Sequence, residues 1–437
     1  MHTTAVRVGI SGLCLCLYSL SLSGRPAEGA GIDNPTLQEE LRQELRQRVL
    51  PYWYDTAIDH QHGGFVLADR GTGEPGVPEE KQLVSQARMI WGFSLAHTRG
   101  WSDSRRDYLK AAEQGFRFLL NHFRDDRNGG YFWSTDLTGQ PRNRNKIMYG
   151  QAFVIYGLVE LHRAGGSREP LDRALELYRE LQQHAYDREH GGWIEHFTSE
   201  WTPILKPAPG AIVEVAGYKS ANTHLHLMEA FTELYEATRD PAVRNSLEEA
   251  LRLNQKYFYP RRAEESCFHR QRDWKPVTDP ASAGLSYGHN VEFAWLMIRA
   301  ERVLGRRPSW SHFYAHLDHA LKCGYDHEHG GTYSRGVKDE PATDTDKVWW
   351  VQSEMLAALT DALLHKPNPR YGRALDSQLD FIRQHLADPR TRVWRDTVRA
   401  DGSPKAPSLA HNWKANYHDV RAVVKFIEAA PQQKTAR

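Results

Sequence analysis

Histidine and carboxylate side chains at helical spacing are the first feature of this sequence with the means to do chemistry. His289 and Glu292 lie three positions apart in a stretch of helical periodicity, so they share a face on which the carboxylate would orient the imidazole or raise its basicity. Histidine titrates at an unperturbed pKa of about 6.5, so it both takes up and releases protons near neutrality. Together with His226, His418 and Arg88, the pair suits removal of a proton next to a carbonyl group, because an arginine stabilises the developing enolate oxygen.

Further candidates fall in six segments that recur at about one per repeat of the sequence. Each segment carries aromatic, histidine or amide residues where a surface helix would be charged, and polar groups of this kind are costly to bury unpaired. Taken singly, most of them have a commoner structural role, such as core packing or an ion pair. Their joint occurrence predicts one cleft, whose aromatic rings offer flat faces to a sugar. The predicted site residues are Arg88, Tyr149, Asn222, His226, His289, Glu292, Trp349, Trp350, Trp413 and His418, and the sequence leaves open which of Trp349 and Trp350 faces the cleft.

The elements that must position these residues come from an internal repeat. Four segments share the pattern Asp-x-x-x-Gly-Gly, with second glycines at Gly64, Gly130, Gly192 and Gly331. The steps between them are 66, 62 and 139 residues, and the last is about twice the others. A degenerate unit is therefore expected at residues 264–268, and a sixth, weaker one at residues 388–394. Repeats at a fixed period indicate repeated supersecondary units.

Each unit of about 66 residues has room for two helices and a loop. Glycine permits the positive φ of a tight turn and aspartate closes it, so the Asp…Gly-Gly segments are expected between helices. Six helical hairpins predict an all-α fold, an (α/α)6 barrel with inner and outer rings, in a single domain over residues 32–437. Two helical domains are the alternative, which the even spacing and the lack of a Pro/Ser/Gly linker disfavour.

The N-terminal residues have a different character. Residues 1–31 contain one arginine, Arg7, before an apolar run and then small residues, which is the layout of a secretory signal peptide. An uncleaved anchor is the alternative, and no later stretch approaches the length of a membrane span. We therefore expect export to the periplasm or the medium. The 437-residue chain has a net charge of +1 and no basic block, which argues against nucleic acid or an anionic membrane as a partner.

Metal and cofactor chemistry finds little support. The sequence has no His-Glu-x-x-His motif and no phosphate-binding loop, and His224 and His226, two positions apart, point to different faces of a helix. Outside the leader only Cys267 and Cys323 remain, too few for a zinc or iron–sulfur site or a disulfide framework. We expect no metal and no cofactor.

Several motifs resemble those of the N-acylglucosamine 2-epimerase superfamily, most closely its cellobiose 2-epimerase branch. The resemblance extends over nearly the whole chain after the leader. Its most specific pieces are NTHLHLMEA at residues 222–230, SYGH at 286–289, MYGQAF at 148–153 and WWVQ at 349–352. It implies an (α/α)6 barrel and 2-epimerisation of the reducing-end sugar through a cis-enediolate, without a metal or redox cofactor.

The resemblance also implies a role for each candidate. His289 and His418 look like the acid/base pair, with Glu292 supporting His289. His226 would aid ring opening or hold the C1 oxygen, and Arg88 would stabilise the enediolate. Tyr149 and Asn222 would hydrogen-bond the sugar, one of Trp349 and Trp350 would face it, and Trp413 would stack on a second sugar.

Three positions depart from the family pattern. Asn290 stands where an aspartate is usual, and in the last motif Asn416 replaces proline and Asp419 replaces asparagine. Asn290 is expected to change the hydrogen bonding around His289. Asn416 and Asp419 border the expected subsite for the second sugar, so they bear on disaccharide preference more than on proton chemistry. The leading prediction is a 2-epimerase of β-1,4-linked disaccharides such as cellobiose or mannobiose. The alternatives are an aldose–ketose isomerase or a 2-epimerase of free mannose, glucose or N-acylglucosamine, an (α/α)6 glycoside hydrolase, and a non-catalytic sugar-binding protein.

Overall fold

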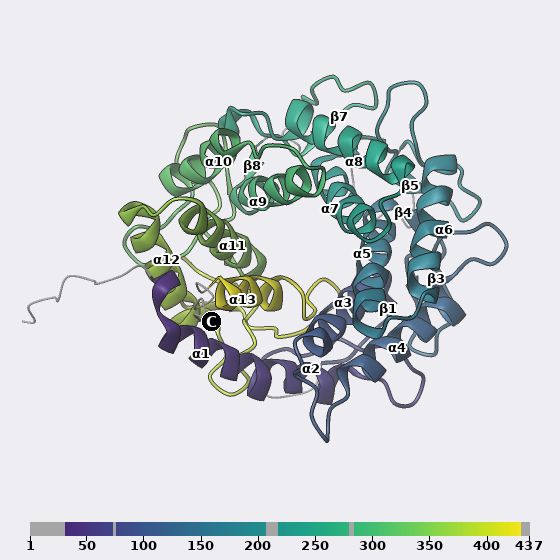
Figure 1. The fold of residues 1–437 in the computed structure, drawn as a ribbon, viewed down its shortest axis with the longest axis horizontal. Helices are drawn as coiled ribbons and strands as arrows, with labels where there is room; N and C mark the ends of the chain where they lie inside the picture. The colour runs from purple at the N-terminus through teal and green to yellow at the C-terminus, as the bar shows by residue number, and fades with distance from the viewer. Residues whose placement is uncertain (1–30, 73–75, 207–216, 279–283, 430–437) are drawn as a thin grey trace, which may run out of the picture.

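The helices form two concentric rings in a computed structural model that describes residues 31–72, 76–206, 217–278 and 284–429 (Figure 1). The inner ring consists of α3 (Leu83–Thr98), α5 (Met148–Gly165), α7 (Ala221–Thr238), α9 (Tyr287–Val303), α11 (Trp349–His365) and α13 (His418–Glu428). The outer ring consists of α1 (Pro35–Glu44), α2 (Leu50–Ala57), α4 (Tyr108–Phe118), α6 (Glu169–His184), α8 (Pro241–Leu253), α10 (Trp310–Cys323) and α12 (Pro369–Phe381). The architecture is an (α/α)6 barrel, which confirms the prediction from the repeat.

The two rings differ in how their residues are buried. Inner helices are buried on nearly every side: in α3 every residue from Leu83 to Ala96 is buried. Outer helices such as α6 bury one face and expose charged residues on the other. An all-round buried helix is expected where helices pack on both sides. α4, α8 and α12 each continue into a terminal π-helical turn, at Leu119–Phe123, Asn254–Phe258 and Ile382–Leu386, and another π-helical turn, Leu45–Val49, joins α1 to α2.

Short antiparallel strands connect neighbouring units. The strand that precedes an inner helix pairs with one that follows the next Gly-Gly loop, so Lys81 and Gln82 lie opposite Thr135 and Ser134. The sheets are β1 (Lys81–Gln82), β2 (Ser134–Thr135) and β3 (Pro141–Asn143); β4 (Lys146–Ile147) and β5 (His196–Phe197); β6 (Lys219–Ser220) and β7 (His269–Arg270); β8 (Leu285–Ser286) and β9 (Arg335–Gly336); β10 (Lys347–Val348), β11 (Thr397–Val398) and β12 (Pro404–Ala406). A bridge between Asp69 and Ala410 joins the first unit to the last and closes the ring.

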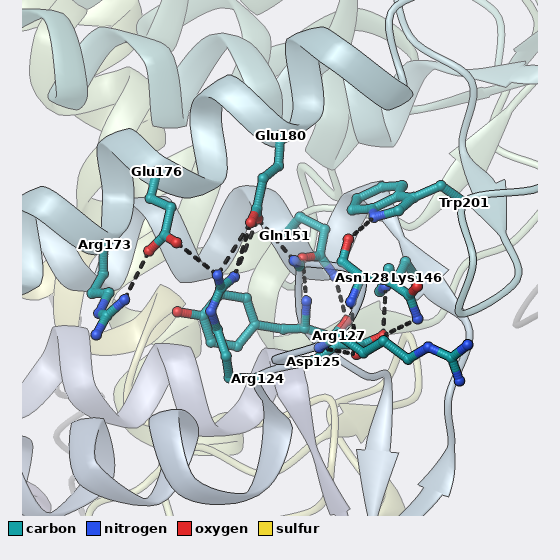
Figure 2. Close-up of polar contacts among 12 residues, drawn as sticks. Arg124, Asp125, Arg127, Asn128, Lys146, Gln151, Arg173, Glu176, Glu180 and Trp201 are labelled. Carbon is teal, nitrogen blue, oxygen red and sulfur yellow. Dashed lines mark hydrogen bonds and ion pairs between the residues drawn. The ribbon is translucent and has the colours of Figure 1, made fainter.

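A buried lysine fastens each complete Asp…Gly-Gly loop to the helix that follows it. In the second unit Asp125 Oδ1 accepts from the backbone N–H groups of Arg127 and Asn128, and Lys146 Nζ donates to Asp125 Oδ2 at 2.8 Å (Figure 2). The same Asp–Lys pair recurs as Asp59–Lys81 at 2.7 Å, Asp187–Lys219 at 3.0 Å and Asp326–Lys347 at 2.8 Å. In the degenerate unit the aspartate is missing, and Leu285 stands in place of the lysine.

A second contact fixes the residue after each Gly-Gly pair. Gln151 Nε2 donates to the Tyr131 carbonyl at 2.8 Å, and its Oε1 accepts from the Tyr131 N–H at 3.0 Å (Figure 2). Gln86 holds Phe65 and Gln352 holds Thr332 in the same way, and His224 accepts from the Trp193 N–H. These contacts set the height at which each inner helix begins. His224 therefore faces outward to a loop, which agrees with its predicted separation from His226.

Residues 1–30 of the predicted leader lie outside the described residues. Within the described part of the chain, no helix is long and apolar enough to cross a membrane. Cys267 and Cys323 are free thiols.

Replacing Lys347 with methionine tests the Asp–Lys pair. Removing one partner leaves Asp326 as a buried charge without its cation, so we expect the free energy of unfolding to fall by about 3 kcal/mol. The matched control is Lys405→Met, because Lys405 is half-exposed in its ion pair with Asp346, and surface pairs contribute less than about 1 kcal/mol. Urea denaturation followed by circular dichroism measures both, and equal losses would contradict this account.

Candidate active site

All ten predicted site residues line one cavity of about 240 Å³. It lies at the N-terminal ends of the inner helices, where α3 supplies Arg88, α5 supplies Tyr149 and α7 supplies Asn222 and His226. His289 and Glu292 come from α9, Trp349 and Trp350 from α11, Trp413 from the turn before α13, and His418 from the first residue of α13. These side chains converge on one cavity because they stand at the same position of their helices: Arg88, His226 and Glu292 are each the sixth residue of their helix.

The structure brings the three histidines and both tryptophans together. The ring of Trp350 lies 4.6 Å from that of His289 and 6.0 Å from that of His418, centroid to centroid. Trp350 is therefore in contact with both members of the predicted acid/base pair. Trp349 also lines the cavity, at 6.5 Å from His418. Trp349 and Trp350 therefore both face the cleft.

Behind the cavity wall, Arg421 on α13 lies buried between three carboxylates. Its Nη2 donates to Glu292 Oε1 at 2.9 Å and to Glu354 Oε1 at 2.8 Å, and its Nη1 donates to Glu229 Oε1. Burial opposes the charge on Arg421, but the carboxylates, Glu354 first, raise its pKa well above the ordinary value. One guanidinium therefore holds three acidic groups from three different inner helices.

The three carboxylates do not share the same protonation state. Burial would raise the pKa of Glu354, but Arg421 and a hydrogen bond from His418 outweigh it and lower the pKa to about 2. The pKa of Glu229 is likewise lowered, by Arg421 and His226 against burial. Burial and the neighbouring Glu354 charge raise the pKa of Glu292 well above its ordinary value. Glu292 is thus the carboxyl group of the cluster whose neutral form is favoured, and its Oε2 has no hydrogen-bond partner within the described residues.

Two histidines are oriented by these carboxylates. His418 Nδ1 donates to Glu354 Oε1 at 2.7 Å, and His226 Nδ1 donates to Glu229 Oε2 at 2.8 Å. A carboxylate only accepts, so each Nδ1 carries the hydrogen and each Nε2 keeps a lone pair. Burial lowers the pKa of His418 to about 3 and that of His226 below its ordinary value, so both are neutral bases at pH 7.

His289 differs from the sequence-based expectation. No hydrogen bond joins it to Glu292 in the described structure: Glu292 Oε1 accepts from Arg421, and His289 Nδ1 has no partner. The prediction that Glu292 orients His289 is therefore wrong. Glu292 bonds Arg421 instead, because a charged guanidinium is a stronger hydrogen-bond donor to a carboxyl group than a neutral imidazole. Burial lowers the pKa of His289 to about 3, so it too is a neutral base.

Arg88 is a buried cation, and no carboxylate of the described residues forms an ion pair with it. Its Nη1 donates to the Trp413 carbonyl at 2.8 Å and its Nη2 donates to the Tyr149 hydroxyl at 2.9 Å. Its guanidinium also lies 4.3 Å from the ring centroid of Phe153. A buried charge paired only with neutral acceptors favours a negative charge that develops beside it.

His418, Glu292 and Glu354 form a candidate cation site, with ligand atoms within 4.8 Å of one another. The Arg421 guanidinium already bonds both carboxylates there and takes the place that a metal ion would occupy.

Glu229, Glu354, Arg421 and Tyr417 are the residues that sequence reasoning missed. The Tyr417 hydroxyl donates to Glu229 Oε1 at 2.8 Å, and Glu354 also accepts from Trp295 Nε1 at 2.9 Å. A signal was present: Glu229 follows His226, and Arg421 follows His418, at the same spacing of three that singled out His289 and Glu292.

Comparison with known proteins agrees with this geometry. The sequence model of the N-acylglucosamine 2-epimerase (GlcNAc 2-epimerase) family matches residues 63–422. The chain belongs to that family. A curated cellobiose 2-epimerase of Bacteroides fragilis is 30% identical over 409 residues, which are 90% of this chain and 98% of the relative. The solved cellobiose 2-epimerase of Spirochaeta thermophila DSM 6192 superposes with a TM-score of 0.80 at 32% identity, covering 90% of this chain and 96% of that one. A D-mannose isomerase of Marinomonas mediterranea is 24% identical over 87% of this chain and 95% of its own length.

The positions at which this epimerase-family chain departs from the expected motifs lie beside the cavity. Asn290 Nδ2 donates to the Ala263 carbonyl at 3.4 Å. Asp419 Oδ2 lies 4.0 Å from Lys414 Nζ, and both side chains are buried. The side-chain atoms of Asn416 are buried without a hydrogen-bond partner in the described structure. Asn416 and Asp419 therefore follow the turn that carries Trp413, whereas Asn290 bonds the loop at Ala263, and the three histidines still line the cavity.

Replacing Arg421 with methionine tests the carboxylate cluster. Removal of the guanidinium leaves buried carboxylates without a cation, so we expect a loss of about 3–5 kcal/mol of unfolding free energy at pH 7. In the variant the folded carboxylates have raised pKa values, so stability falls as the pH rises above the unfolded value of about 4.3. In the wild type the raised pKa of Glu292 gives the same sign, but the low folded pKa of Glu354 gives the opposite one: its contribution is present above about pH 4.3 and is lost as the pH falls toward 2.

Denaturation at pH 5 and pH 8 distinguishes the two proteins, because all three carboxyl groups have raised pKa values in Arg421→Met and only Glu292 has one in the wild type, so stability should fall more between these pH values in the variant. Arg421→Lys, which keeps the charge, should lie between the wild type and Arg421→Met. Arg99→Met is the control, because its ion pair with Glu428 is on the surface. A pH dependence of Arg421→Met that matched the wild type would refute the assignment.

Proposed function

We propose that the protein is a sugar 2-epimerase that interconverts glucose and mannose at the reducing end of a β-1,4-linked disaccharide of the cellobiose or mannobiose type. The observation that carries the proposal is a pair of neutral histidines, the partly buried His289 and the buried His418, both in contact with Trp350 beside the unpaired cation Arg88. Epimerisation at C2 needs a base on one face of the carbon and an acid on the other.

The protonation states give a balanced sequence of steps. Ring opening moves the C1 hydroxyl proton to His289, while Glu292, the neutral acid, protonates the ring oxygen. His418 then removes the C2 proton to give a cis-enediolate, whose charge Arg88 stabilises. After rotation about the C2–C3 bond, the His289 imidazolium protonates C2 on its other face.

Ring closure restores the starting state. Glu292 recovers its proton from the C5 hydroxyl, and His418 returns a proton to the C1 oxygen. Both histidines end neutral and Glu292 ends protonated, as they began. His226 Nε2, left as an acceptor by the Nδ1 bond to Glu229, accepts a hydrogen bond from a sugar hydroxyl near the reacting carbons. Tyr149 and Asn222 are placed to hydrogen-bond the same sugar.

Trp413 supports a disaccharide as the substrate. Its side chain is 39% exposed, although it lines the cavity, and its ring lies 5.8 Å from that of Trp133. An exposed aromatic face beside the cavity suits stacking on a second sugar ring. We also propose, from the layout of residues 1–31, that the protein is exported and meets its sugar outside the cytoplasm.

An aldose–ketose isomerase is the second candidate, favoured by the similarity to a D-mannose isomerase. It would use the same enediolate and return the proton to C1. Glycoside hydrolysis needs two facing carboxylates, whereas Glu292 is the one carboxylate of the described residues that lines this cavity.

Incubation with cellobiose and with mannose in D₂O, followed by NMR, tests the function. We expect deuterium at C2 of a glucosyl-mannose product, and His418→Asn should lower kcat by about 10²–10⁴-fold because it removes the base. The matched control, His62→Ala, removes an exposed histidine of a Gly-Gly loop and should retain full activity. A ketose as the main product would favour the isomerase, release of a monosaccharide would favour a hydrolase, and heat stabilisation by sugar without isotope exchange would indicate a binding protein.

A further inference from the structure

Residues 407–417, between β12 and α13, carry Trp413 to the edge of the cavity without belonging to a helix or a sheet. At their centre is a tight turn, in which the Lys414 N–H donates to the His411 carbonyl at 2.8 Å and the His411 N–H donates to the Lys414 carbonyl at 3.3 Å. Trp413 lies at the tip of this turn. Its position therefore depends on what holds His411.

His411 connects the turn to the start of α11. Its Nδ1 accepts from the Trp413 N–H at 3.2 Å, so the hydrogen of the neutral ring is on Nε2, which donates to Asp396 Oδ2 at 2.6 Å. The Asp396 carbonyl in turn accepts from the Trp349 N–H at 2.8 Å, and the His411 ring meets that of Trp349 edge to face at 5.7 Å. His411 thus ties the Trp413 turn to the helix that carries Trp349 and Trp350.

The turn also orients the unpaired cation. The Trp413 carbonyl is one of two acceptors for the Arg88 guanidinium, the other being the Tyr149 hydroxyl. A rotation of the turn would move the Trp413 ring and withdraw the Arg88 acceptor together. One side chain outside the cavity therefore controls both the stacking surface and the direction of the guanidinium.

We propose that His411 is a positioning residue for this reaction: through its bonds to Asp396 and to the Trp413 N–H it fixes the stacking face for the second sugar and the orientation of Arg88. The kinetic consequences of this proposal rest on the proposed function. Its structural consequences can be measured on the protein without a substrate. His411 is absent from the cavity lining, so it acts through the positions of Trp413 and Arg88 and not by touching the sugar.

Two variants and one control separate this role from a general loss of stability. His411→Ala removes both bonds. His411→Asn keeps an acceptor for the N–H two residues further on, as asparagine does in turns, and so rescues the turn but not the bond to Asp396. His62→Ala again removes an exposed loop histidine.

The structural readout uses protein labelled with 5-fluorotryptophan and needs no substrate. The fluorine resonance of Trp413, assigned by its loss in Trp413→Phe, should shift or broaden in His411→Ala, return toward the wild-type position in His411→Asn, and stay unchanged in His62→Ala. An unchanged Trp413 resonance in His411→Ala would overturn the proposal, whatever the activity of the protein.

The kinetic readout compares two substrates. We expect His411→Ala to raise KM for cellobiose by about tenfold, the cost of one lost hydrogen bond to a positioned group, and to change C2 exchange on free mannose less. Equal KM values for cellobiose in His411→Ala and the wild type would overturn the positioning role. Absence of C2 exchange in the wild type would instead refute the proposed function, and the fluorine resonance would still test the turn.

Discussion

A guanidinium buried among three carboxylates is the interaction on which the rest of the cavity depends. Arg421 accounts for why Glu229 and Glu354 remain ionised in a buried environment, and those two carboxylates in turn fix the tautomers of His226 and His418. One cation does not keep all three acids ionised, and burial beside the charged Glu354 favours the neutral form of Glu292. The protonation states of the carboxyl groups, the orientation of the histidines and the charge balance of the cavity therefore all depend on Arg421. The cost of burying these charges is offset only because each is bonded, which is the condition under which such clusters persist.

The barrel makes this cluster possible by bringing separate inner helices to the same height. Each complete loop is fastened by an Asp–Lys pair and by a glutamine or, at Trp193, by His224, so the first turn of the next helix starts at a fixed point. Residues at equivalent positions then face one another across the ring, which is how α3, α7 and α9 deliver Arg88, His226 and Glu292 to one cavity. The loops are structural devices, and the chemistry belongs to the helices that follow them.

Much of the fold could be predicted because its signal is local and repeated. Asp…Gly-Gly recurs in four loops whose glycines have a positive φ, as at Gly130 with φ of 69°, and the spacing of these loops indicates the number of units. The cavity residues were predictable because histidine and tryptophan are unusual on helices that should be charged or plainly apolar. Arg421 and Glu354 were not, since the spacing of three between His418 and Arg421 is also common on exposed helix faces, and Glu354 has no histidine at that spacing. Only the relative rotation of α9, α11 and α13 shows that they are buried together, and only their mutual charges decide that Glu292 bonds Arg421 and not His289.

The central claim concerns where the protons are before a sugar binds. Neutron diffraction from deuterium-exchanged crystals of the free protein at pH 7 observes them directly. The account predicts deuterium on Glu292 Oε2 and on Nδ1 of both His226 and His418, with no deuterium on Nε2 of either ring. An ionised Glu292, or deuterium on Nε2 of His418, would contradict it.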